Sequence, residues 1–142
     1  MFMKSLGHPI SFYAYALATM LTLLIGIVYA TRKQIMPYHL KALETAWEDI
    51  DTKYQFMLRV FLNDAGAGAL STGLFMLVLL LIPFRDGQLW AGYAIGIVGL
   101  VSGLHLLYIV YSVRKNTKGN PPIRVVVLLN LALIIGLMFL VF

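Results

Sequence analysis

Cysteine is absent from this chain of 142 residues, and charged residues are scarce. Without cysteine there is no disulfide framework, no thiolate metal site and no cysteine nucleophile. Charged residues make up 12% of the chain, about half of the roughly 25% that is usual in soluble domains. Hydrophobic residues reach 61%, which also excludes a disordered chain, because disorder requires low hydrophobicity. The composition therefore indicates a membrane protein.

The positive net charge does not indicate a nucleic-acid-binding protein. The formal net charge is +5, from 11 Lys and Arg against 6 Asp and Glu. These basic residues lie in short segments between long apolar runs instead of forming one basic patch. We expect membrane lipid as a partner and no nucleic acid.

Four apolar stretches are long enough to cross a bilayer: residues 10–30, 56–82, 89–113 and 123–142. A helix of about 20 residues spans a hydrocarbon core of roughly 30 Å. Pro83 and Gly87 mark a tight turn between the second and third stretches, and Pro121 and Pro122 precede the fourth. The predicted fold is an all-α integral membrane protein, a single domain of residues 1–142 built as a bundle of four transmembrane helices.

The distribution of lysine and arginine predicts the orientation. Two loops carry most of the basic residues: Arg32, Lys33, Lys41 and Lys53 in the first, and Arg114, Lys115, Lys118 and Arg124 around the third. The other side has only Lys4 and Arg85. Because basic loops stay in the cytoplasm, residues 31–55 and 114–122 are predicted to be cytoplasmic. Both termini are then periplasmic, and the expected location is a bacterial inner membrane.

The first loop is predicted to contain a short amphipathic helix. Apolar residues recur at helical spacing at Leu40, Leu43, Trp47 and Ile50. Such a helix suits the membrane interface, and the alternative is a lid over a cytoplasmic cavity or a docking surface. Asp51 or Thr52 is expected to cap the following helix, which should protrude into the cytoplasm by a turn or more.

Polar residues inside the membrane are the candidate site, because they are costly there and usually face the bundle interior. Counting from the cytoplasmic boundary predicts one layer about 10–13 Å deep, to which all four helices contribute: Thr22, Asn63, Asp64, His105 and Asn130. Tyr29, Arg59 and Tyr108 are expected above it, nearer the cytoplasm. The predicted feature is a ligand-binding polar pocket in the cytoplasmic half.

Two interpretations of this layer remain open. In one, the side chains only hydrogen-bond between helices and hold them together. In the other, Arg59 binds an anionic group while Asp64 and His105 handle a proton, which makes these two the catalytic candidates. No metal site is expected, because His8, His39 and His105 lie at different depths.

Four glycines form a stripe along the third span, at Gly92, Gly96, Gly99 and Gly103. Small residues let membrane helices approach closely, so we expect helix packing on this face. His105 points nearly the opposite way. The third span is then buried on two sides, which favours a homo-oligomer or a partner membrane subunit.

Three short motifs resemble a group of small bacterial four-span membrane proteins to which no function is assigned. They are residues 36–39 (MPYH), 82–87 (IPFRDG) and 121–122 (PP). This resemblance covers nearly the whole chain and implies the four-span fold alone.

A second resemblance is to the MAPEG family of glutathione-dependent membrane enzymes. The segment from Arg59 to Asn63 is similar to the family's Arg-x-x-x-Asn segment, and Pro122 to Arg124 is similar to the start of its fourth helix. Gly66 stands where the family has an acidic residue. The resemblance implies a glutathione-dependent transferase that works as a trimer, with Arg59 and Arg124 holding glutathione.

The functional prediction from sequence is a binding protein of unknown activity rather than an enzyme. It binds an amphipathic ligand, lipid or quinone-like, or a membrane partner, through the polar layer, and no cofactor is expected. The alternatives are the MAPEG-like transferase, with glutathione, and a structural subunit of a larger membrane complex.

Overall fold

The structure is a computed structural model that describes residues 2–141 and the side chains of residues 7–140. Its elements, in chain order, are α1 (Phe2–Thr31), α2 (Pro37–Leu43), η1 (Trp47–Asp49), α3 (Thr52–Leu79), η2 (Leu80–Phe84), α4 (Leu89–Asn116) and α5 (Ile123–Val141). Four helices are long and apolar enough to cross a membrane, which confirms the predicted four-span bundle. Phe142, the last residue of the fourth predicted span, and the side chain of Lys4 lie outside the described residues.

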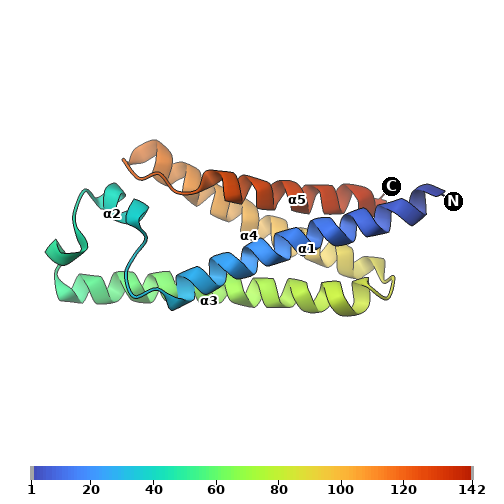
Figure 1. The fold of residues 1–142 in the computed structure, drawn as a ribbon, viewed down its shortest axis with the longest axis horizontal. Coiled ribbons are helices and arrows are strands. Elements are labelled where there is room, and N and C mark those ends of the chain that lie inside the picture. Colours follow the sequence, from blue (N-terminus) through green and yellow to red (C-terminus); the bar gives the residue numbers. More distant parts are fainter. Residues whose placement is uncertain (1, 142) are drawn as a thin grey trace.

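Helix α1 runs through the middle of the bundle (Figure 1). It packs against α3 on one side and against α5 on the other, and α4 packs against α5. The turn between α3 and α4 lies at the end that holds both chain termini. We call the other end, where Arg32, Lys33, Arg114 and Lys115 lie, the basic end.

Close packing of α1 against α3 depends on glycine. A β-carbon on Gly66 would lie 2.2 Å from the backbone nitrogen of Ala30, and one on Gly26 would lie 2.7 Å from that of Leu70. No side chain fits between backbones at this distance, so these positions fix the register of the two helices. Gly66 of α3 is therefore level with the last turn of α1.

This register makes α3 extend past α1 at the basic end. The span formed by α3 and η2 has 33 residues, whereas about 20 residues cross the hydrocarbon core. The 11 residues 52–62 of α3 precede the point where α1 ends, which corresponds to about 17 Å of helix. Helix α3 thus extends past the end of α1, while its protrusion into the cytoplasm stays a prediction.

At the end that holds the termini, α3 continues into η2, a short π-helix that contains Pro83. Proline has no backbone N–H, and the hydrogen bonds shift to a wider spacing, from Arg85 N to Leu80 O at 3.2 Å and from Gln88 N to Pro83 O at 2.9 Å. The ring of Phe84 is fully buried against Tyr15. His8 ties α1 to this turn, because its Nε2 lies 3.0 Å from the Phe84 carbonyl oxygen.

The helix of the first loop is shorter than the sequence pattern predicts. It stops at Leu43, and Trp47 lies in the separate turn η1. Glu44 adopts a left-handed conformation with φ of 53°, which ends a helix, and its carboxylate accepts from Lys118 Nζ at 2.7 Å. Asp51 caps α3 as expected, since its side chain accepts from the backbone N–H of Lys53 at 2.9 Å.

Two glycines of α3 provide a matched test of the α1–α3 contact. Gly66→Ala should lower the free energy of unfolding by about 1–3 kcal/mol, because its methyl group meets backbone that cannot move aside. Gly68→Ala should leave stability unchanged or raise it by up to about 1 kcal/mol, because a β-carbon there meets nothing within 4 Å. Thermal unfolding in mild detergent measures both, and equal effects would contradict the proposed register.

Candidate functional site

A cleft lies between α3 and α4. The two helices are joined at the end that holds the termini and diverge toward the basic end (Figure 1). Two cavities fill the gap. One, of about 300 Å³, is the inner chamber, and the other, of about 410 Å³, is the outer chamber. Leu106 of α4 lines both, so the two chambers adjoin each other at this side chain.

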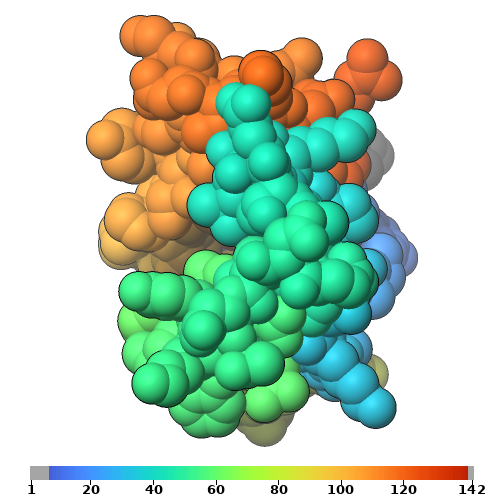
Figure 2. All heavy atoms as spheres, turned by 90° about the vertical axis from the view of Figure 1, so that its left-hand side faces the viewer, coloured from blue at the N-terminus to red at the C-terminus, as the bar shows by residue number. Residues whose placement is uncertain are grey.

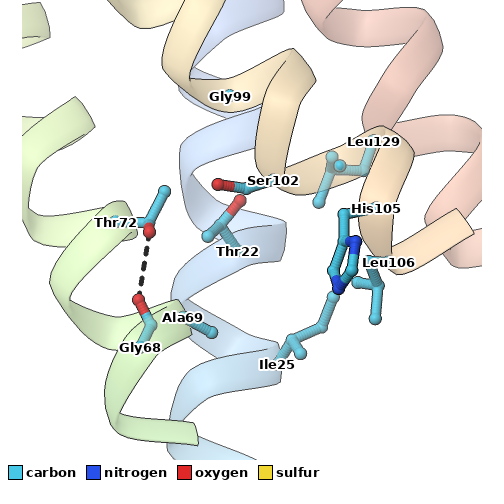
Figure 3. Close-up of a pocket in the computed structure, with 11 residues that line it drawn as sticks. Thr22, Ile25, Gly68, Ala69, Thr72, Gly99, Ser102, His105, Leu106 and Leu129 are labelled. Atoms are coloured by element: carbon cyan, nitrogen blue, oxygen red, sulfur yellow. Dashed lines mark hydrogen bonds between the residues drawn. The ribbon is translucent and has the colours of Figure 1, made fainter. Parts of the chain in front are cut away.

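The inner chamber contains a small group of polar side chains. Thr22 of α1, Thr72 of α3, and Ser102 and His105 of α4 line it together (Figure 3). Thr22 precedes the end of α1 by nine residues, and His105 precedes Arg114 by nine, which places both about 14 Å from the basic end. The inner chamber thus lies near the middle of a hydrocarbon core of roughly 30 Å.

These four side chains differ in their hydrogen bonding. Thr22 donates to the Ala18 carbonyl at 2.8 Å and Thr72 to the Gly68 carbonyl at 3.0 Å, each within its own helix. Within residues 7–140, Ser102 and His105 form no hydrogen bond, and both side chains are exposed in the cleft. They are the two free polar groups of the inner chamber.

The outer chamber is apolar and lies closer to the basic end. Its walls include Phe61 and Ala65 of α3 and Ile109 of α4, all exposed, so the cleft opens sideways between the two helices. Helix α2 covers the chamber with His39 and Ala42. Viewed from the basic end, the segment that carries α2 lies between the green atoms of α3 and the orange atoms of α4 and α5, with a notch at one side (Figure 2).

Helix α2 is held in place from two directions. The hydroxyl groups of Tyr38 and Tyr29 share a hydrogen bond, and the connection between α4 and α5 passes so close that a β-carbon on Gly119 would lie 2.7 Å from the Tyr38 carbonyl oxygen. Burial, and then the bond with Tyr29, raise the pKa of Tyr38 well above its usual range. The Tyr38 phenol is therefore neutral at every working pH and retains this bond.

The residues predicted to form one polar layer occupy two different depths. Asn63, with its amide nitrogen turned toward α1, donates to the carbonyl oxygens of Tyr29 at 3.0 Å and Arg32 at 3.3 Å. It therefore satisfies the carbonyl groups at the end of α1, and Asp64 beside it is exposed. Thr22 and His105 lie deeper, in the inner chamber, so the structure does not place Asp64 with His105.

The remaining predicted residues lie outside the inner chamber. Arg59 is exposed on the protruding part of α3, with its guanidinium 5.8 Å from the ring of Phe56. Tyr108 is 69% exposed, and Arg124 is exposed at the start of α5.

Asn130 and the glycine stripe belong to the contact between α4 and α5. The amide nitrogen of Asn130 donates to the carbonyl oxygens of Gly103 at 3.0 Å and Val126 at 2.8 Å. A β-carbon on any of the four stripe glycines would lie 2.5–2.8 Å from a leucine of α5 or from Asn130. These glycines are Gly92, Gly96, Gly99 and Gly103. This face of α4 is thus filled by α5, which leaves His105 to face the cleft.

Sequence reasoning missed Thr72 and the open space at Gly68. Both lie in the run of small residues from Ala65 to Gly73, which is typical of helix packing. In the structure Gly66 and Gly73 do pack on α1, whereas Gly68 and Thr72 face the cleft. The helical spacing of four between Gly68 and Thr72 was the available signal.

Comparison of the chain with known protein families, with curated proteins and with solved structures found no match. In the part of the chain that the structure describes, no group of three His, Cys, Asp or Glu side chains could hold a metal ion. The cleft is therefore assessed on its own geometry.

Acid should lower the stability of the fold through His39, which lies in the helix that covers the outer chamber. The Met36 backbone N–H donates to its Nδ1 at 3.3 Å, and burial lowers the pKa of His39. The unfolded chain thus binds a proton more readily than the folded one, and stability should fall as the pH drops below about 6.5. Melting temperatures between pH 7.5 and pH 5 should fall more for the natural chain than for His39→Gln, and parallel curves would contradict this role.

Proposed function

We propose that this protein binds an amphipathic lipid of the bilayer in the cleft between α3 and α4. The observation that carries the proposal is the pair of adjoining chambers, both mostly apolar and open sideways, with a few polar side chains in each. Cavities of about 300–1,000 Å³ with few polar groups are typical of small-molecule sites.

The orientation of the bundle supports access from one leaflet. Basic residues gather at the end where α2 covers the outer chamber, and basic loops are retained in the cytoplasm. We infer that this end is cytoplasmic, in a bacterial inner membrane, with both termini periplasmic. The lateral opening then faces the cytoplasmic half of the bilayer, so a lipid enters without leaving the membrane.

A lipid also explains why exposed side chains line the cleft. Ile109 and Phe61 are 44% and 63% exposed, and in a bilayer such surfaces contact acyl chains rather than water. A bound chain extends that contact inward past Leu106 to the inner chamber. The site needs no charged residue for this purpose.

Two alanines on α3 test the proposal. Ala69→Phe fills the inner chamber, which Ala69 lines, whereas Ala67→Phe adds the same ring at an exposed position that lines neither chamber. Native mass spectrometry after extraction in mild detergent should show lipid retained by the natural chain and by Ala67→Phe, and several-fold less lipid on Ala69→Phe.

The same measurement counts chains and detects partner proteins. Equal lipid retention by both variants would place the lipid elsewhere on the surface. A stoichiometric partner protein in place of lipid would instead support the structural-subunit alternative.

A further inference from the structure

The inner chamber offers two polar side chains that can donate a hydrogen bond. Ser102 and His105 lie three positions apart on α4, and neither has a partner within residues 7–140. The hydroxyl protons of Thr22 and Thr72 already go to carbonyl groups of their own helices. Among the described residues that line this chamber there is no Asp, Glu, Lys or Arg.

The depth of these donors limits the kind of head group they can receive. They lie about 14–18 Å from the basic end, near the middle of the membrane, where bringing a charge is costly. A phospholipid keeps its charged head group at the membrane surface and places only acyl chains at this depth. Unpaired donors in an apolar environment instead call for a neutral acceptor such as a carbonyl oxygen.

The inner chamber has open space on its α3 side. Gly68 lines the chamber without a side chain, and a β-carbon on Gly68 would meet nothing within 4 Å. In Figure 3 the Ser102 side chain extends from α4 toward Thr22 of α1, and the His105 ring lies beside Ile25 and Leu106. A ring bound in this chamber would direct a long tail past Leu106, which also lines the outer chamber.

We propose that the inner chamber binds the head group of an isoprenoid quinone, with Ser102 and His105 donating hydrogen bonds to its carbonyl oxygens. This inference rests on the proposed function, since it names the class of lipid that the same cleft takes. The tail leaves through the outer chamber toward the lateral opening. Binding alone is proposed, with no electron transfer.

The test uses the full chain in nanodiscs of phosphatidylcholine and a benzoquinone that carries a decyl tail. Bound quinone should saturate at one molecule per chain above the background of empty nanodiscs. Ser102→Ala and His105→Phe should each weaken binding about 3- to 10-fold, the value of one neutral hydrogen bond. Ser71→Ala and Tyr108→Phe are matched controls that should leave binding unchanged, because Ser71 and Tyr108 are exposed and line neither chamber.

Infrared spectroscopy of the bound quinone distinguishes a residue that donates a hydrogen bond to it from a residue that only maintains the fold. With isotope-labelled carbonyl groups, the carbonyl stretch of the bound quinone should shift to lower frequency, and Ser102→Ala should abolish part of that shift. Unshifted carbonyl bands in the natural chain, or variants that bind as tightly as the controls, would overturn the assignment of the donors.

The two proposals fail in different ways. If the protein retains acyl lipid in a manner sensitive to Ala69→Phe but does not bind the quinone, the present inference is wrong and the lipid-binding cleft stands. The same conclusion follows if a diacylglycerol displaces the retained lipid from the protein and the quinone does not. If neither lipid nor quinone is retained, both proposals are wrong.

Discussion

The backbones of α1 and α3 meet where Gly66 and Gly26 remove the side chains that would separate them. This contact holds α3 against one side of α1, while α5 packs against the other side of α1. Helix α4, packed through its glycine stripe on α5, then reaches α3 only near the shared turn. The cleft is therefore a consequence of where the helices pack closely, because α3 packs on α1 and α4 packs on α5, whereas α3 and α4 make few contacts with each other.

Polar groups in this membrane fold separate into those that hold helices and those that remain free. Asn63 satisfies the end of α1, Asn130 joins α4 to α5, and Ser11 donates to the Gly136 carbonyl at 2.8 Å. Each of these bonds joins two helices. Ser102 and His105 make no such bond within the described chain, and that contrast locates the candidate site more sharply than polarity alone.

Much of the fold could be predicted because long apolar runs, prolines and basic loops are local signals. The four spans and the cap at Asp51 follow from the residues themselves. The polar layer could not be placed correctly, because depth was counted from an assumed boundary near residue 56, whereas α3 first meets α1 near Asn63. The break at Glu44 was also hidden, since it accompanies an ion pair with Lys118, which lies 74 positions away.

The sideways opening of the cleft changes what sets its occupancy. A ligand that arrives through the bilayer is never dissolved in water, so its effective concentration is its mole fraction among the surrounding lipids. Two membranes with the same amount of protein but different lipid composition would then hold different fractions of filled bundles. If the cleft binds lipid as proposed, its occupancy would follow the composition of the leaflet around the gap between α3 and α4.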